Sequence, residues 1–205
     1  MSEMLAFVEL GFRHITDLAG LDHVLFLVAL AAIYRPLEWR RLIWVVTSFT
    51  VGHSVTLALA ATGALQMPTN VIEFLIPVTI VATCIENLVT SGRVGNRSFA
   101  RYRPVLAGIF GLVHGAGFAN YLRSLFMDQI ALPLFGFNVG IELGQMVVLV
   151  LALAAFALVD GAIAAAIRAR RAPMPGASPL RLRAIAVSSL VGIVATRWAL
   201  ERLPW

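Results

Sequence analysis

The sequence predicts an all-α polytopic membrane protein, a bundle of six transmembrane helices preceded by a short N-terminal interfacial helix. The 205 residues are 60% hydrophobic and only 13% charged, and the mean hydropathy is +0.86. These values lie outside the usual range of soluble domains. The apolar residues are also grouped into runs of roughly 17–24 residues, the length at which a helix crosses about 30 Å of hydrocarbon.

Short polar gaps separate the six apolar runs, which cover residues 16–34, 42–62, 70–90, 104–123, 136–159 and 183–200. Residues 1–13 are too few to span a bilayer but have one apolar face, which predicts an interfacial helix. The sequence shows no second soluble domain. We therefore expect residues 1–205 to form one transmembrane domain in the lipid bilayer, with residues 169–182 as a cytoplasmic linker.

The basic residues predict the orientation of the bundle. All 16 are arginines, and they are concentrated in the gaps after the first, third and fifth runs, whereas the gaps at 63–69 and 124–135 contain none. Positive residues favour the cytoplasmic side of a membrane. We therefore expect both termini outside, on the side of the membrane opposite the cytoplasm. The same distribution argues against a nucleic-acid-binding surface.

All four histidines, His14, His23, His53 and His114, lie in or at the edge of apolar runs. An ionisable group inside a bilayer costs several kcal/mol unless it faces a cavity or a partner. Imidazole is also the commonest protein ligand for transition metals. The sequence therefore predicts an intramembrane centre for a divalent metal, Ni, Co or Zn. His14 would join it only if the helix breaks near Gly20.

The expected topology places the ionisable residues at a common depth. With both termini outside, a rise of about 1.5 Å per residue puts them in one layer roughly 10–13 Å below the outer face. The layer contains Asp22, His23, His53, His114 and Glu142. The imidazoles would bind the metal, and the two carboxylates would act as ligands or orient the imidazoles.

Other polar residues are expected to support this layer or to lie below it. Asn138 and Gln145 share a helix face with Glu142, and Ser54 follows His53. These three are expected to support the ligands. Glu86 and Asn87 fall nearer the cytoplasmic side, where they would form an inner relay for the ion.

Glycine stripes predict close helix packing. Gly136, Gly140 and Gly144 repeat every four residues, and Gly108, Gly111 and Gly115 form a similar stripe. Small residues in such stripes allow membrane helices to approach closely. The sequence leaves homo-oligomerisation open.

Several of these segments together resemble the HupE/UreJ family of bacterial membrane proteins, which is associated with nickel and cobalt uptake. The matching segments are His14 with GLDHVLFLVAL, FTVGHSVTLALA, the IEN around Glu86, FGLVHGAGF and FNVGIELGQ. The resemblance implies the membrane fold and a role in metal uptake.

Because of two departures, the chain resembles a more divergent branch of that family. The family pattern has a histidine followed five residues later by Asp-His, but here seven residues separate His14 from Asp22. The second histidine that the permeases have shortly after the later His-Gly is also missing after His114.

Three functions remain open on the sequence. The first is uptake of nickel or cobalt across the cytoplasmic membrane. The second is an intramembrane metal-dependent hydrolase acting on a lipid or a membrane peptide, with Glu142 or Asp22 as the catalytic base beside a three-histidine metal. The third is a structural or assembly subunit with a hydrogen-bonded core.

Overall fold

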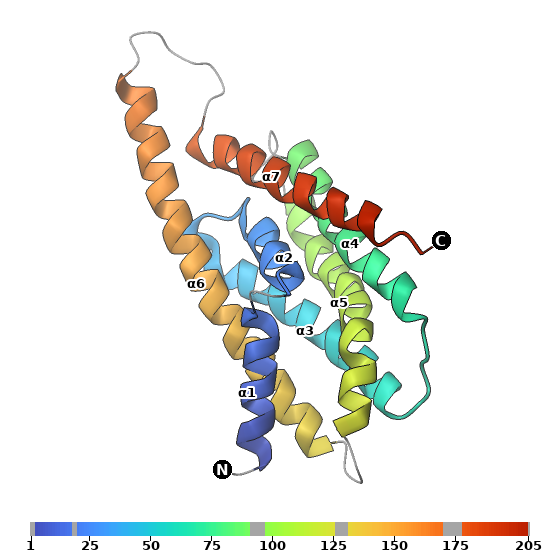
Figure 1. The fold of residues 1–205 in the computed structure, drawn as a ribbon. Helices are drawn as coiled ribbons and strands as arrows, with labels where there is room; N and C mark the ends of the chain where they lie inside the picture. Colours follow the sequence, from blue (N-terminus) through green and yellow to red (C-terminus); the bar gives the residue numbers. More distant parts are fainter. Residues whose placement is uncertain (1–2, 18–19, 91–96, 126–130, 170–177, 205) are drawn as a thin grey trace.

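The computed structural model describes residues 3–17, 20–90, 97–125, 131–169 and 178–204, and these residues are helical apart from short connections. The helices are α1 Glu3–Thr16, α2 Asp22–Ala31, the 3-10 turn η1 Pro36–Glu38, α3 Trp39–Ala61, α4 Thr69–Thr90, α5 Arg97–Leu125, α6 Ala131–Ala169 and α7 Pro179–Glu201. No strand occurs in the described ranges. The all-α prediction is confirmed (Figure 1).

The six-span count is not confirmed. Within the described residues, four helical segments are long and apolar enough to cross a membrane: Pro36–Ala61, α4, α6 and α7. The first predicted span, 16–34, is wrong, because its helical part α2 has only ten residues. Ten residues rise about 15 Å, half of the hydrocarbon thickness. The 29-residue α5 is not among the four segments.

The first two helices are divided at another place than the sequence predicts. The expected interfacial helix ends at residue 13 and the expected first span runs through residues 16–34. Helix α1 continues to Thr16, and α2 begins at Asp22. Gly20, which has low helix propensity, lies between them, and its N–H donates to the Asp17 carbonyl in a turn. Helix α1 also packs along α6 rather than standing apart as an interfacial helix would.

Two helix pairs are packed at backbone distance, as the glycine stripes predict. A Cβ on Gly140 would overlap the carbonyl oxygen of Val8, which joins α6 to α1. A Cβ on Gly52 would overlap the carbonyl oxygen of Gly108, which joins α3 to α5. These pairings set the neighbours of the histidines, because His14 lies on α1 and His53 on α3.

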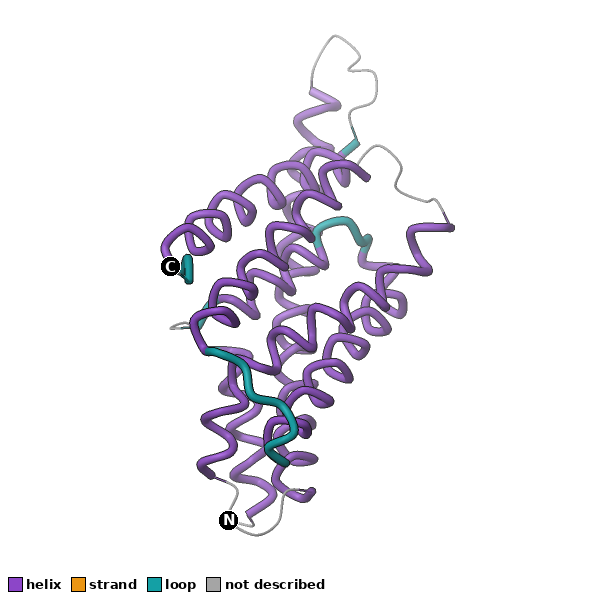
Figure 2. The backbone as a smooth tube through the Cα atoms, turned by 90° about the vertical axis from the view of Figure 1, so that its right-hand side faces the viewer, coloured by secondary structure: helices purple, strands orange, loops and turns teal. Residues whose placement is uncertain are grey.

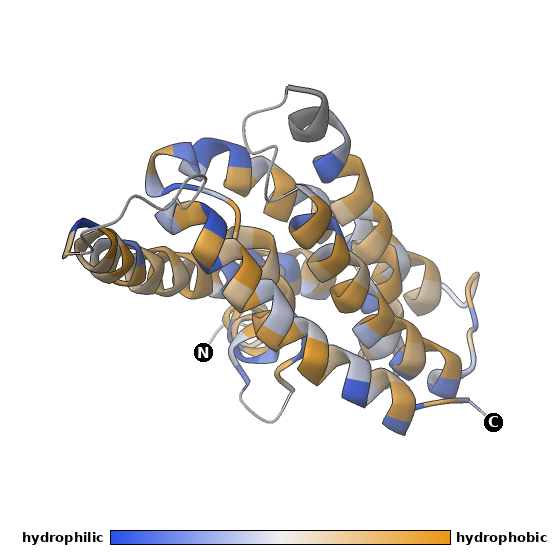
Figure 3. Cartoon of the chain, turned by 90° about the horizontal axis from the view of Figure 1, so that it is seen from above, coloured by the Kyte–Doolittle hydropathy of each residue, from blue (hydrophilic) through white to orange (hydrophobic). Residues whose placement is uncertain are grey.

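Hydrophobic residues make up most of the long helices (Figure 3), and many of them are exposed. Leu158 of α6 is 77% exposed and Ile193 of α7 is 70% exposed. Large apolar surfaces of this kind are typical of contact with another apolar phase. Together with the four long helices, they support a multi-pass membrane protein.

The ends of helices α4 to α7 divide between the two ends of the molecule. The C-terminal ends of α4 and α6 and the N-terminal ends of α5 and α7 lie toward one end of the molecule, at the top of Figure 1. The start of α1 lies at the other end, as do the C-terminal end of α5 and the N-terminal end of α6 (Figures 1 and 2). Most of the predicted linker 169–182 falls outside the described residues. Which end faces the cytoplasm stays a prediction.

Candidate metal centre

Three histidines from three helices meet inside the bundle. His14 comes from the end of α1, His23 from the first turn of α2 and His53 from the middle of α3. One ligand atom of each lies within 4.8 Å of those of the other two. The ring centroids of His14 and His23 are 4.6 Å apart, and those of His23 and His53 are 6.0 Å apart. This spacing suits three ligands of a single metal ion.

The break between α1 and α2 creates this group. On one continuous helix, residues nine apart lie about half a turn out of phase, so His14 and His23 would point away from each other. Because α1 ends at Thr16 and α2 begins at Asp22, the two rings instead meet in an edge-on contact. The sequence allowed His14 to join the site only if the helix breaks near Gly20, and the structure has such a break between α1 and α2.

His114 lies next to the group and is held separately. Its ring centroid is 5.1 Å from that of His23, but it does not belong to the set whose ligand atoms are all within 4.8 Å. Its Nε2 is 2.9 Å from the hydroxyl oxygen of Thr79 on α4. His114 therefore forms a second position, between the histidine group and α4.

The histidines are buried and surrounded by aromatic rings. His53 is 0%, His114 1% and His23 6% exposed. The rings of Phe118 and Phe137 pack against His14, with centroid distances of 4.1 Å and 5.6 Å. An apolar wall of this kind excludes water and favours neutral imidazole, which is the form that binds a metal.

Several ring nitrogens in this group have no hydrogen-bond partner in the described part of the chain. They are Nε2 of His14 and His23, both nitrogens of His53, and Nδ1 of His114. Buried polar atoms are normally hydrogen-bonded, so these atoms are suited to hold a ligand. Three imidazoles form a nitrogen donor set that fits Ni, Co or Zn.

The two predicted carboxylate ligands have other neighbours. Asp22 pairs with Arg202, whose Nη1 lies 3.3 Å from both carboxylate oxygens. Glu142 lines a pocket of about 400 Å³ between α3 and α6, together with Thr50 and Asn138. Neither carboxylate belongs to the histidine group within the described residues. Their roles as direct ligands stay predictions.

The residues expected to support the site are near it on α3 and α6. Gln145 is fully buried and accepts a hydrogen bond of 2.8 Å from the hydroxyl of Thr50, one turn before His53. The hydroxyl of Ser54 donates to the carbonyl of Thr50, at 2.6 Å. Ser54 is thus engaged within its own helix.

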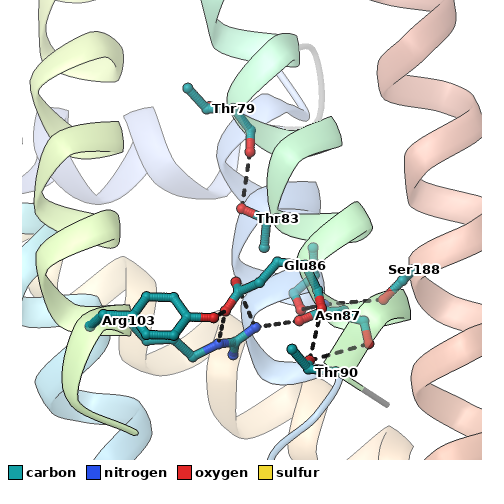
Figure 4. A network of polar contacts seen from close by, with 9 residues as sticks. Thr79, Thr83, Glu86, Asn87, Thr90, Arg103 and Ser188 are labelled. Carbon is teal, nitrogen blue, oxygen red and sulfur yellow. Dashed lines mark hydrogen bonds and ion pairs between the residues drawn. The ribbon is translucent and has the colours of Figure 1, made fainter. Parts of the chain in front are cut away.

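The expected inner pair, Glu86 and Asn87, belongs to a dense polar network (Figure 4). Arg103 donates to both oxygens of Glu86, from Nε at 2.9 Å and from Nη2 at 3.0 Å. Asn87 accepts from Arg103 and donates to the carbonyl of Ala29 at 2.7 Å and to Ser188 at 3.1 Å. The network links α2, α4, α5 and α7.

Sequence reasoning missed Arg103 and Thr79. Arg103 is 3% exposed, but its place among the arginines of a gap suggested a purely topological role. Thr79, Thr83 and Glu86 are spaced four and three apart, the periodicity of one helix face. That spacing was the available signal for a polar stripe on α4.

Comparison with protein families assigns the chain. The model of the HupE / UreJ protein family matches residues 1–202. This chain belongs to the HupE/UreJ family. Membership implies a membrane protein related to nickel and cobalt transport. No curated protein and no solved structure matches the chain.

The structure explains how this HupE/UreJ protein accommodates its altered spacing. The longer interval between His14 and Asp22 is taken up by the turn between α1 and α2. Both histidines therefore reach the same group, although their spacing differs from the family pattern, in which a histidine is followed five residues later by Asp-His.

Proposed function

We propose that this chain binds Ni²⁺ or Co²⁺ as its cargo at His14, His23 and His53 and moves the ion across the cytoplasmic membrane into the cell. The observation that carries the proposal is the meeting of three imidazoles from separate helices within 4.8 Å. Borderline metals such as these prefer imidazole nitrogen. The family supports transport-related metal handling.

The surroundings of the carboxylates favour transport over hydrolysis. A metal hydrolase of the three-histidine type needs a carboxylate that accepts a proton from the metal-bound water. Asp22 is paired with Arg202, and Glu142 lies in the pocket between α3 and α6. In contrast, polar side chains continue from His114 along α4 to Glu86, as a path for an ion requires.

Metal content of the purified protein tests the binding site. The full chain is expected to retain about one Ni²⁺ or Co²⁺ per chain, measured by elemental analysis after loading and removal of excess metal. His23→Ala and His53→Ala should each release it, because two remaining imidazoles hold the ion too weakly. Thr56→Ala is a matched control, since Thr56 is buried on α3 one turn from His53.

Two outcomes would contradict the site. One is wild-type protein that takes up no metal even after supplementation, and the other is unchanged metal content in His53→Ala. Transport is tested separately by metal accumulation in cells. Glu86→Gln should abolish accumulation while the purified variant keeps the histidine-bound ion. Wild-type accumulation in Glu86→Gln cells would argue against an inner relay and for the hydrolase.

A further inference from the structure

A buried polar stripe runs along α4 from the histidines toward the inner network. Thr79 is 6%, Thr83 1% and Asn87 0% exposed. The stripe begins at His114, whose Nε2 contacts the Thr79 hydroxyl at 2.9 Å, and Thr83 donates to the carbonyl of Thr79 at 3.0 Å. Such a stripe inside a bundle is costly unless it serves a polar partner.

The stripe ends at a guanidinium group. Arg103 donates to both oxygens of Glu86 and to the side-chain oxygen of Asn87. The hydroxyl of Tyr102 also donates to Glu86, at 2.6 Å, and the guanidinium lies over the ring of Tyr34 at 5.6 Å. The carboxylate of Glu86 and the amide oxygen of Asn87 thus hold one positive charge (Figure 4), and the Tyr102 phenol lies against the same carboxylate.

We propose that Glu86, Asn87 and Tyr102 form a second, all-oxygen cation site and that Arg103 occupies it as a tethered cation. Cargo leaving the histidines must displace the guanidinium before it can pass inward. This inference rests on the proposed function, because it assigns the second binding site for the same ion.

The two sites differ in their affinity for the cargo. Imidazole nitrogen holds Ni²⁺ or Co²⁺ more strongly than neutral and carboxylate oxygens do, and oxygen donors suit harder cations such as Mn²⁺. Thr79 and Glu86 are seven residues apart, a rise of about 10 Å. An ion that reaches Glu86 is therefore held weakly, close to the point of release.

Only two of the three guanidinium nitrogens of Arg103 donate hydrogen bonds to the described residues. Its Nη1 is buried and has no hydrogen-bond partner among the described residues. Its other two nitrogens carry the bonds to Glu86 and Asn87. A divalent cation at the same oxygens would bring twice the charge and so a stronger Coulomb attraction to the Glu86 carboxylate.

Mn²⁺ binding to the purified full chain tests the inner site, because Mn²⁺ prefers oxygen ligands. Arg103→Gln should bind one Mn²⁺ per chain more than the wild type, counted by electron paramagnetic resonance. The double variant Glu86→Gln with Arg103→Gln should lose that ion. Arg197→Gln is the control, since Arg197 also pairs with a carboxylate, Glu201, away from the stripe.

Folded Arg103→Gln protein that binds no additional Mn²⁺ would overturn the proposal. So would an additional ion that persists when Glu86 is replaced. Arg103→Lys provides a second test, because a lysine keeps the charge but cannot bridge Glu86 and Asn87 with a fork of donors. It should admit the additional ion at higher Mn²⁺ concentration, and no binding at saturation would count against the site.

If neither variant folds, Arg103 is a structural residue, and that result also overturns the proposal. The same samples separate this inference from the proposed function. Histidine-dependent Ni²⁺ binding without the additional Mn²⁺ defeats the inner site alone. Wild-type protein without Ni²⁺ or Co²⁺ defeats the histidine centre, whatever Arg103→Gln does.

Discussion

Arg183→Ala is expected to destabilise the protein and weaken the histidine centre at the same time. Arg183 of α7 is completely buried and pairs with Asp160 of α6. It also donates to the carbonyls of Ala32 and Tyr34, at 3.3 Å and 2.7 Å. These carbonyls follow the short helix α2, so Arg183 holds the end of the helix that begins with His23.

The contacts of Arg183 set the size of the effect. Its removal leaves a carboxylate without its buried partner and two carbonyls without a donor, and it exposes the ring of Phe156, which lies 4.7 Å from the guanidinium. Breaking a buried ion pair from one side costs about 3–5 kcal/mol. In a chain of this length, about 1 kcal/mol shifts Tm by roughly 2–4 °C. We expect a loss of roughly 6–20 °C in detergent solution.

Thermal unfolding followed by circular dichroism measures this shift, and metal titration of the same samples measures the centre. Arg197→Ala is the control, because Arg197 is on the same helix and its pair with Glu201 is exposed, so a change of less than about 1 kcal/mol is expected. If Arg183→Ala unfolds at the wild-type temperature and binds metal as tightly, Arg183 does not support α2.

Three further predictions concern packing, protons and topology. Gly140→Ala should lower the stability of the protein, because the new Cβ would overlap the Val8 carbonyl. Gly161→Ala on the same helix is the control: its Cβ meets nothing within 4 Å, and the variant should gain about 0.5–1 kcal/mol of stability. Equal unfolding temperatures of the two variants would contradict the close packing. Acidification from about pH 7.5 to about pH 5 should release the metal, because protons compete for imidazole nitrogen. Equilibrium dialysis measures the bound metal at each pH. Metal retained at low pH would argue against histidine ligands. Single cysteines at 63–69, with Cys84 replaced, should react with an impermeant thiol reagent in intact cells and those at 170–181 should not; the reverse pattern would invert the topology.

The sequence predicts the class of fold well and the first helix poorly, for one physical reason. Hydropathy records whether a segment prefers an apolar environment, and residues 16–34 do so whether or not they form one helix. Helix α1 nevertheless ends at Thr16 and α2 begins at Asp22, and α1 packs against α6, a tertiary contact that hydropathy does not record. The long helices α4, α6 and α7 have no such break, and for them hydropathy and structure agree.

In the candidate site, too, some features could be predicted from the sequence and others could not. The common depth of His23 and His53 follows from the topology, and the structure brings these two residues together. The environment of Asp22 depends on Arg202, which is 180 residues away in the chain and was not expected to contact it. Local spacing cannot reveal a partner at that distance.

The cost of burying the histidines bears on the assembly-subunit alternative. His14, His23 and His53 each have at least one ring nitrogen without a partner among the described residues. Each such atom costs about 1–3 kcal/mol, so the three together cost roughly 3–9 kcal/mol. Leucine or phenylalanine at the same positions would pack the core without this cost. A single cation bound at the proposed site would satisfy one nitrogen of each ring, which would explain three imidazoles in an apolar pocket better than a role in packing does.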